Sequence, residues 1–583
     1  MKIACIQLNA TVGDFLGNVE KLQAAYKKAV ALGAELVVGP ELFICGYPPR
    51  DWLVYESFMQ RHDTALAHLQ SAIGEVPLIV GCVTRNEKRP GKALFNSAVV
   101  LQKATELKRF HKTLIPTYDV FDEDRYFEPA LATNDKSIVL GGKKIGVTIC
   151  EDIWNDEDFW DENARMYDCD PVEELMRGKE AEEAIDLLVN VSASPWHLGK
   201  EKTRLSMLQE LAQHHALPIV QTNLVGGNDE LVFDGQSLVI NADGELLTTG
   251  KAFEEDIFVA DVTLRGQAPS LNENEDEGAD EDDFKAEAES KMDSTRHSHR
   301  MGEEEALFYA LSLGTRDYVR KCGFEKVTIG LSGGIDSAVT AVVAVDALGP
   351  ENVLGVLMPS GYSSEGSITD AEALAQILEI DYEVLPIEKL FRESMQHLDA
   401  VLKETESDTT EENMQSRLRG LTLMAIANKQ GRLVLTTGNK SELAVGYCTL
   451  YGDMCGGLAV ISDVTKSQVY KMSRWINRNQ QIIPHNTLNK PPSAELRPDQ
   501  KDEDSLPLYD VLDAILEAYI EQYKGLEEIV ALGYERELVE DILRKVDSNE
   551  YKRRQAAPGL KVTAKAFGIG RRMPVAQGFK HKQ

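Results

Sequence analysis

The sequence predicts an α/β protein in two parts, because short β-like runs alternate with helical segments on both sides of one acidic break. A chain of 583 residues exceeds one ordinary domain, and its 43% hydrophobic content supports real cores. The break, residues 266–302, is densely acidic and almost free of aliphatic residues, so it cannot bury enough apolar surface to offset its ordering entropy. We expect domains over 1–265 and 303–583, joined by a solvated linker without a specific partner.

Before the break, helices are expected near residues 18–32 and 202–215, between many short strands. The β-like runs are KIACIQL, ELVVGPEL, PLIVGCV, LFNSAVVL, KIGVTICED, DLLVNVSA, LPIVQTNLVG and SLVINADGEL.

After the break, strands and helices alternate strictly. Helices are expected over 303–321, 336–348 and 369–378, and the strands between and after them are VTIG, NVLGVLMPS and YEVLPI. This alternation predicts a parallel, doubly wound sheet.

Composition excludes several classes of protein. The formal net charge of −33 repels nucleic acid and anionic lipid, so a nucleotide site must supply its own positive charge or backbone N–H groups. No run of about 20 apolar residues is present, which argues against a membrane protein, and the first residues lack the features of a secretory signal. Eight scattered cysteines without CxxC spacing indicate reduced thiols in a cytoplasmic protein.

Three residues at the ends of β-like runs form a chemically coherent set. They are Glu41 in VVGPELFICGY, Lys112 in FHKTLIPTYDVF and Cys150 in IGVTICEDIW. A carboxylate can take the thiol proton and later deliver it to a leaving amine. A lysine ammonium can lower the thiol pKa and stabilise an oxyanion, which the backbone N–H of Glu151 can also do. Each residue alone has an ordinary structural explanation, as a core cysteine, a helix-capping acid or a solvated lysine.

The run VTIGLSGGIDSAVT predicts a strand, a glycine loop and a helix. Adjacent glycines let backbone N–H groups approach an anion, and the following helix directs its positive end at it. No GK[ST] follows, so the loop is not a Walker A motif. Asp336 fits a bridging Mg²⁺ rather than direct phosphate contact. The alternative is a plain glycine turn in which Asp336 or Ser337 caps the helix.

Taken together, GPELFICGYPP, HKTLIPTYDVFDEDRYF and TICEDIW resemble the nitrilase-like amide-hydrolase family, and more narrowly its glutaminase branch attached to NAD synthetases. The resemblance covers residues 1–265. It implies an α-β-β-α sandwich in which Glu41 is the general base, Lys112 an electrostatic helper and Cys150 the thioester-forming nucleophile.

The same resemblance implies a glutamine site formed by Tyr118 and by Ser194 and Lys200 of NVSASPWHLGK. Glu123 leaves two interpretations open. It is either a second carboxylate near Lys112, or it forms a salt bridge to Arg125 or is a surface charge.

The loop of the second half resembles the ATP pyrophosphatase family. The segments ENMQSRLRGLTLMAIANKQGRLVLTTGNKSELAVGY, LYGDMCGGLAVISDVTKSQVY and KPPSAELRP are similar to NAD synthetases over most of 303–583. This resemblance implies a Rossmann-like fold and assigns residues to ligands. ATP is assigned Gly330, Leu331, Ser332, Gly333, Gly334, Ile335, Asp336, Ser337, Thr437, Lys466 and Ser493; Mg²⁺ is assigned Asp336 and Glu442; deamido-NAD is assigned Arg417, Glu442 and Lys561.

Some positions depart from the family pattern. Leu450 and Gly457 replace a lysine and an aspartate that ammonia-only members carry, and Lys561 lacks the histidine that usually precedes it. Asp453, Glu442 or another subunit could supply replacement contacts.

The resemblance implies that ammonia from glutamine displaces AMP from an adenylated deamido-NAD, giving NAD, with an internal ammonia passage and a homo-oligomeric assembly. Three rival hypotheses remain: a nitrilase-family amide hydrolase with a nucleotide-sensing second domain, a different ATP-pyrophosphatase amidotransferase, and a non-catalytic nucleotide-binding protein. Pyrophosphate release with deamido-NAD would separate the first rival from the main hypothesis.

Overall fold

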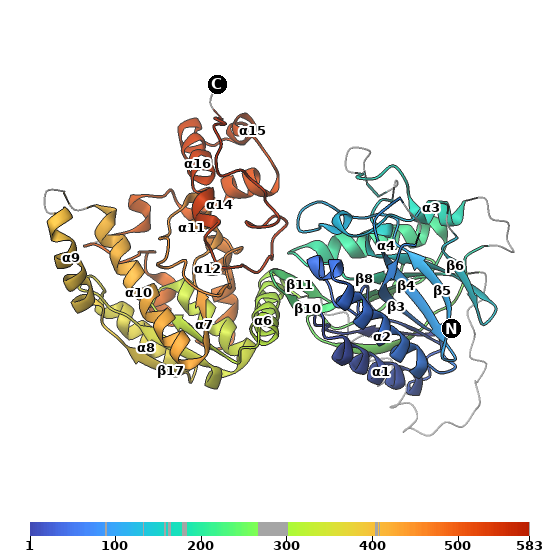
Figure 1. Ribbon diagram of the computed structural model, residues 1–583. Helices are drawn as coiled ribbons and strands as arrows, with labels where there is room; N and C mark the ends of the chain where they lie inside the picture. The colour runs from blue at the N-terminus through green and yellow to red at the C-terminus, as the bar shows by residue number, and fades with distance from the viewer. Residues whose placement is uncertain are drawn as a thin grey trace, which may run out of the picture. The chain divides into compact units, whose positions relative to one another are not determined.

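The computed structural model describes residues 1–581 except 88–89, 132, 134, 157–158, 161–164, 178–183, 266–300, 403–405, 407 and 499. The chain forms two compact units (Figure 1). One contains Met1–Asn228 and Phe233–Met301, and the other contains Asp229–Val232 and Gly302–Gln583. The predicted linker lies almost entirely outside the described residues.

The first unit contains two six-stranded sheets. The order in the first is β14 (Asp256–Asp261), β1 (Lys2–Gln7), β2 (Leu36–Val38), β3 (Leu78–Arg85), β4 (Leu94–Gln102) and β5 (Thr105–His111). The order in the second is β13 (Leu246–Thr249), β12 (Leu238–Ile240), β9 (Ile219–Asn223), β8 (Leu187–Ser192), β7 (Lys143–Ile149) and β6 (Ser137–Leu140). Strands β1–β3 and β7–β9 pair in parallel, and the outer strands pair antiparallel. Two further strands are β10 (Val225–Asn228) and β11 (Leu231–Asp234).

The two sheets pack face to face, because one buried cluster joins Cys5 and Ile79 of the first sheet to Val147 and Val189 of the second. Neighbouring residues of a strand point to opposite faces. Leu188 therefore lies in a different cluster, formed with helices α3 (Pro171–Met176) and α4 (Lys200–His215). Helices α1 (Phe15–Ala31) and α2 (Glu56–Ala72) contact each other, and α1 contacts strands of the first sheet. The predicted α-β-β-α sandwich is confirmed.

The second unit contains one five-stranded sheet in which every pair is parallel. Its order is β17 (Asp381–Val384), β16 (Val353–Leu357), β15 (Lys326–Gly330), β18 (Arg432–Thr436) and β19 (Leu458–Ala459). The chain starts at the central strand, moves to one edge and returns to the other side of β15. This confirms the doubly wound sheet and puts its switch point between β15 and β18, where such folds bind ligands.

The helices of this unit agree closely with the sequence prediction. Helix α6 (Glu303–Lys321) has the predicted bounds, α7 (Ile335–Leu348) starts one residue early, and α8 (Glu365–Ile377) starts four residues early. The other helices are α9 (Glu388–Leu402), α10 (Thr409–Gln430), α11 (Lys440–Val445), α12 (Lys466–Ile476), α13 (His485–Asn489), α14 (Tyr509–Leu516), α15 (Leu526–Ala531), α16 (Arg536–Ser548) and α17 (Glu550–Arg553). Helix α10 packs on the sheet through Leu423, which shares a buried cluster with Val356 and Val434.

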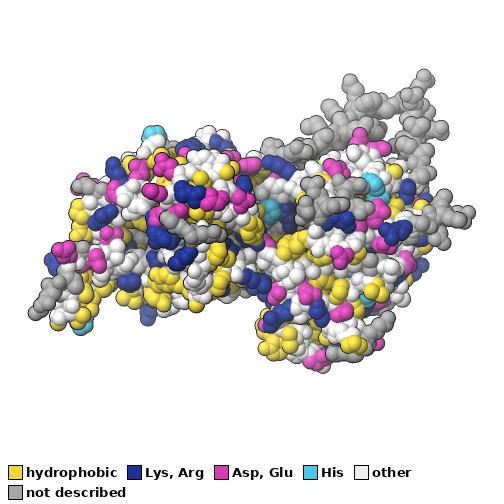
Figure 2. All heavy atoms as spheres, turned by 90° about the horizontal axis from the view of Figure 1, so that it is seen from above, with side chains coloured by type: hydrophobic (Ala, Val, Ile, Leu, Met, Phe, Trp, Pro, Cys, Tyr) yellow, Lys and Arg dark blue, Asp and Glu magenta, His cyan; other side chains and the backbone are white. Residues whose placement is uncertain are grey.

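Among the described residues, no helix combines the length and apolar character needed to cross a lipid bilayer. On the face drawn in Figure 2, Lys and Arg side chains lie scattered among Asp and Glu side chains. This mixed surface gives a polyanion no continuous basic track to follow on that face.

Candidate active sites

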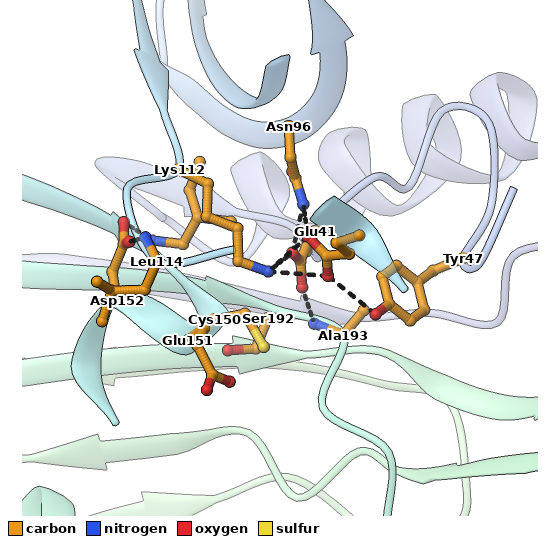
Figure 3. Close-up of polar contacts among 12 residues, drawn as sticks. Glu41, Tyr47, Asn96, Lys112, Leu114, Cys150, Glu151, Asp152, Ser192 and Ala193 are labelled. Carbon is orange, nitrogen blue, oxygen red and sulfur yellow. Dashed lines mark hydrogen bonds and ion pairs between the residues drawn. The ribbon is translucent and has the colours of Figure 1, made fainter. Parts of the chain in front are cut away.

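Glu41, Lys112 and Cys150 converge inside the first unit (Figure 3). The ammonium of Lys112 donates to Glu41 Oε1 at 2.8 Å, and both side chains are fully buried. Cys150, which is also buried, lies beside them at the end of β7. The sequence predicted this set from three motifs that are far apart in the chain.

Backbone geometry fixes the acid and the thiol. Glu41 follows β2, and its carboxylate accepts hydrogen bonds from Asn96 Nδ2 at 2.7 Å and from the N–H of Ala193 at 2.8 Å. Cys150 has φ of 43°, a left-handed conformation that is costly for a residue with a side chain. This sharp change of direction begins the 3₁₀ turn Cys150–Ile153. Asp152 in that turn accepts the N–H of Thr113, which follows Lys112, at 2.9 Å.

The structure resolves the open question about Glu123. Both of its carboxylate oxygens lie 3.0 Å from Lys112 Nζ, and it also accepts from Tyr47 OH at 3.0 Å and Asn96 Nδ2 at 3.1 Å. Glu123 is buried, and Arg125 pairs with Asp51 instead. Glu123 is therefore a second carboxylate of this site. Sequence reasoning missed Asn96 and Tyr47, for which no motif gave a signal.

Electrostatics keep the resting thiol protonated. Burial raises the pKa of Cys150 well above its usual range, and the charge of Glu41 raises it further. Lys112 lowers it, as the sequence suggested, but the burial dominates. A Cys150 thiolate would therefore require a base that removes its proton, and Glu41 is the adjacent carboxylate.

A second group of polar side chains lies around Glu151, the residue after Cys150. Glu151 Oε1 accepts from Tyr118 OH at 2.8 Å and from Tyr167 OH at 3.2 Å. Burial raises the pKa of the Glu151 carboxyl, and the charge of nearby Lys200 opposes this. Lys200 Nζ lies 5.3 Å from the ring centroid of Trp154. Two of the predicted glutamine-binding residues thus flank an acid whose side chain the sequence reasoning did not assign.

The third predicted glutamine-binding residue, Ser194, follows β8. It is 2% exposed, and its N–H donates to Asn223 Oδ1 at 2.9 Å. Ser194 is next to Ala193, whose N–H holds Glu41, so it lies close to the buried acid.

The second unit has a cavity of about 490 Å³ at the carboxyl ends of β15 and β18. The predicted residues that line it are Gly330, Leu331, Ser332, Gly334, Ile335, Asp336, Ser337, Thr437, Glu442, Lys466 and Ser493. Gly333, Arg417 and Lys561 are not among the lining residues. This volume suits a nucleotide-sized ligand.

Lys466 joins the two predicted metal ligands. Its Nζ lies 2.5 Å from Asp336 Oδ2 and 3.2 Å from Glu442 Oε1. Asn439, which caps α11, donates to Asp336 Oδ1 at 2.9 Å. Burial raises the pKa of Glu442 to about 8, an effect that Lys466 opposes and Asp336 increases. Two partly exposed carboxylates that face a cavity have the oxygen donors that Mg²⁺ prefers, so these residues fit the ion.

The glycine loop has the form an anion nest requires. Gly333 has φ of 77°, and a Cβ at this position would lie 2.1 Å from Ser367 O. Only glycine fits this close approach. The hydroxyls of Ser332 and Ser337 lie 3.1 Å apart, and Ser332 Oγ accepts the N–H of Gly334 at 3.2 Å.

Of the residues assigned to deamido-NAD, only one lines the cavity. Glu442 lines the cavity, whereas Arg417 on α10 donates to Leu450 O at 3.2 Å. Lys561 is buried and donates to Thr563 O at 2.9 Å.

Leu450 and Gly457, which depart from the family pattern, are not among the residues that line the cavity. Gly457 packs so closely that a Cβ there would lie 2.3 Å from Leu433 Cδ1. Asp453 does line the cavity, and its carboxylate accepts the N–H of Thr449 at 2.6 Å. Of the replacement residues considered from the sequence, Asp453 and Glu442 therefore both reach the cavity.

Comparisons with known proteins match each half of the chain to a known family. A carbon–nitrogen hydrolase family model matches residues 2–268, and an NAD synthase family model matches residues 307–556. The glutamine-dependent NAD(+) synthetase of Synechocystis sp. is 47% identical over 581 residues, covering 99% of each chain. That of Thermotoga maritima is 44% identical and covers 100% of this chain and 99% of its own.

Solved structures extend the likeness. The glutamine-dependent NAD+ synthetase of Acinetobacter baumannii, solved in complex with ADP, is 36% identical, with a TM-score of 0.72 over 100% of this chain and 99% of that one. The glutamine-dependent NAD(+) synthetase of Cytophaga hutchinsonii shares the fold, with a TM-score of 0.79 and 20% identity. The match covers 99% of this chain and 98% of that one. A carbon–nitrogen hydrolase unit is thus joined to an NAD synthase unit. The chain belongs to the family of glutamine-dependent NAD(+) synthetases.

Proposed function

We propose that this protein hydrolyses glutamine in its first unit and uses the ammonia to convert deamido-NAD to NAD, with ATP cleaved to AMP and pyrophosphate in its second. One observation carries the proposal: a buried Glu–Lys–Cys set and a glycine-loop cavity with two carboxylates and a lysine occur in the same chain. The likeness to full-length glutamine-dependent NAD(+) synthetases supports this function over an amide hydrolase with a nucleotide-sensing domain.

In the first reaction, Cys150 Sγ attacks the side-chain amide carbon of glutamine while Glu41 takes the thiol proton. Lys112 and the N–H of Glu151 stabilise the oxyanion. Glu41 then protonates the leaving ammonia, which leaves a thioester on Cys150. Water, activated by Glu41, attacks the thioester carbon, and glutamate and the free thiol result.

Glutamine orientation is assigned to the residues around Glu151. The carboxylate of Glu151 and the hydroxyl of Tyr118 bind the α-ammonium group of glutamine. Lys200 and Ser194 serve the α-carboxylate as donors.

In the second reaction, the glycine loop and Ser332 hold the ATP phosphates while Lys466 neutralises their charge. Asp336 and Glu442 would hold Mg²⁺, which would neutralise charge on the reacting phosphates. The carboxylate of deamido-NAD attacks the α-phosphate and pyrophosphate leaves. Ammonia then attacks the acyl carbon and AMP leaves.

Several finer assignments belong to the same proposal. Thr437 and Ser493 contact ATP, and Arg417 and Lys561 contact deamido-NAD in a homo-oligomer. Domain limits are proposed at 1–265 and 303–583. An ammonia passage between the sites stays a prediction.

The decisive test separates the two nitrogen sources. NAD formation from deamido-NAD and Mg-ATP is measured with either glutamine or ammonium chloride. Cys150→Ala should abolish the glutamine-supported rate and leave the ammonium-supported rate. Cys82→Ala removes another buried thiol of the same unit and should keep both rates. Loss of both rates in folded Cys150→Ala, or retention of the glutamine-supported rate, would contradict the proposal.

A further inference from the structure

Two helices of the first unit bring three possible metal ligands together, outside the groups assigned to catalysis. Glu173 lies in the first turn of α3, and His214 and His215 lie in the last turn of α4. Glu173 Oε1 is 3.6 Å from the Nε2 atom of each histidine. The three potential ligand atoms all lie within 4.8 Å of one another.

His215 makes this cluster unusual. Its side chain is 7% exposed, and its Nε2 atom is buried without a hydrogen-bond partner among the described residues. The distance of 3.6 Å to Glu173 is too long for a hydrogen bond. A buried polar atom left in this state requires an explanation such as an absent ion or water.

We propose that Glu173, His214 and His215 bind a transition-metal ion of the zinc class. Two imidazoles and one carboxylate are a familiar ligand set for Zn²⁺, with a water in the fourth position. Ligand bonds of about 2.1 Å in a tetrahedron place ligand atoms roughly 3.4 Å apart, close to the observed 3.6 Å. Imidazole ligands disfavour Mg²⁺, which distinguishes this site from the carboxylates of the second unit.

The surrounding charges are mixed. The carboxyl terminus of α4 carries partial negative charge that favours a cation. Asp156 adds negative charge near His215, and Arg265 adds positive charge. Contact between His214 and Glu173 without an ion is the competing state, since His214 is about half exposed. That state leaves Nε2 of His215 without a partner, whereas a metal uses it.

The proposed ion would join α3 to α4. Helix α3 contacts β7 and the turn that begins at Cys150. We therefore expect the ion to stabilise the first unit rather than to take part in the chemistry. The inference does not depend on the proposed function.

The test uses the full chain after removal of metals with a chelator. Titration calorimetry with zinc chloride should show one ion per chain with a dissociation constant below about 10 μM, and magnesium chloride should not compete. Cobalt chloride should give the visible bands of a tetrahedral nitrogen–oxygen site. Thiolate charge-transfer bands in the near ultraviolet would instead show that cysteines bind the ion, and would overturn the proposal.

Matched variants locate the ion. His215→Ala and Glu173→Gln should each weaken zinc binding at least tenfold and remove the zinc-dependent rise in melting temperature. Two control variants should bind zinc as the wild type does. Glu174→Gln changes a neighbouring acid paired with Arg177, and His68→Ala changes an exposed histidine on α2. Because Glu173→Gln preserves side-chain shape, it remains informative if His215→Ala unfolds. Absence of stoichiometric binding in the wild type, or equal binding in wild type and Glu173→Gln, would refute the site.

Discussion

In each unit a lysine ammonium lies between two carboxylates, but the two clusters differ in their access to solvent. In the first unit, Lys112 lies 2.8 Å from Glu41 and 3.0 Å from Glu123. The exposed fractions of these three side chains are 0%, 0% and 6%. A sealed cluster of this kind needs its own counter-charge permanently, because water cannot replace it.

The cluster of the second unit opens into a cavity. Lys466 lies 2.5 Å from Asp336 and 3.2 Å from Glu442, whose side chains are 17% and 18% exposed. These carboxylates can exchange the ammonium for a metal ion, and the ammonium can then meet phosphate oxygens. The comparison teaches that a lysine between two carboxylates keeps a fixed geometry when the cluster is closed and forms an exchangeable ligand set when it is open.

Removing the buried lysine should have the largest effect. Lys112→Met leaves Glu41 and Glu123 facing each other without a counter-charge. Breaking a buried ion pair in this way costs about 3–5 kcal/mol of unfolding free energy. Glutamine hydrolysis should fall at least about 1000-fold, because both the oxyanion donor and the geometry of Glu41 are lost. Calorimetry of unfolding and glutamate release measure the two effects.

The double variant Lys112→Met/Glu123→Gln provides the control. It removes one of the two negative charges that repel each other. The unfolding free energy should therefore recover in part, while glutamine hydrolysis stays absent. Wild-type stability in the single Lys112→Met variant would show that the cluster is not sealed.

The matching change in the second unit should affect activity more than stability. Lys466→Met should lower NAD formation about 100-fold with either glutamine or ammonium, since the phosphates lose a cation. The unfolding free energy should fall by only about 1–2 kcal/mol. Glu442, with a pKa of about 8, readily takes up a proton and so relieves the repulsion from Asp336. A stability loss as large as that of the Lys112 variant would remove the distinction between the two clusters.

Glu123→Gln tests whether glutamine hydrolysis depends on the charge of Glu123 or only on its hydrogen bonds to Lys112. The amide oxygen can still accept from Lys112, and burial already raises the pKa of Glu123. We expect about a tenfold loss of glutamine hydrolysis, because Lys112 is held less firmly, and little change in ammonium-supported synthesis. The rate of glutamate release at saturating glutamine measures the loss of hydrolysis. Inactivation as complete as that of Cys150→Ala would assign Glu123 a direct part in proton transfer.

The two sites also differ in how much of each could be predicted from the sequence. The glycine loop and the helix after it are continuous in the chain, so a local sequence pattern and its family resemblance located most of the cavity lining between Gly330 and Ser337. The sealed cluster depends on strand register instead. Strands β4 and β5 pair with Ser97 opposite His111, and the N–H of Lys112 donates to Asn96 O at 2.8 Å. This pairing is what places Asn96 at the site, and no local pattern encodes it.

Strand β5 itself, with the sequence TELKRFH, was missed because its side chains are mostly partly exposed and polar, without alternation. The Glu173, His214 and His215 cluster was missed for a related reason. Its members lie in helices about 40 residues apart in the chain, and only the packing of α3 and α4 reveals that they meet.

His111, adjacent to Lys112, should give the smallest effect and the clearest pH signature. Burial lowers its pKa to about 4 from 6.5, helped by the charges of Arg109 and Lys136. Between pH 6.5 and 4 the unfolded chain therefore binds a proton that the folded chain does not, so stability falls as pH drops through this window. His111→Asn removes this contribution and should reduce the loss of unfolding free energy between pH 7 and pH 5 by about 1 kcal/mol, allowing for solvent that reaches the ring. Melting curves of both proteins at the two pH values measure the difference. An equal loss in both proteins would mean that the His111 ring takes up its proton at the same pH in the folded and unfolded chains, and that burial does not lower its pKa.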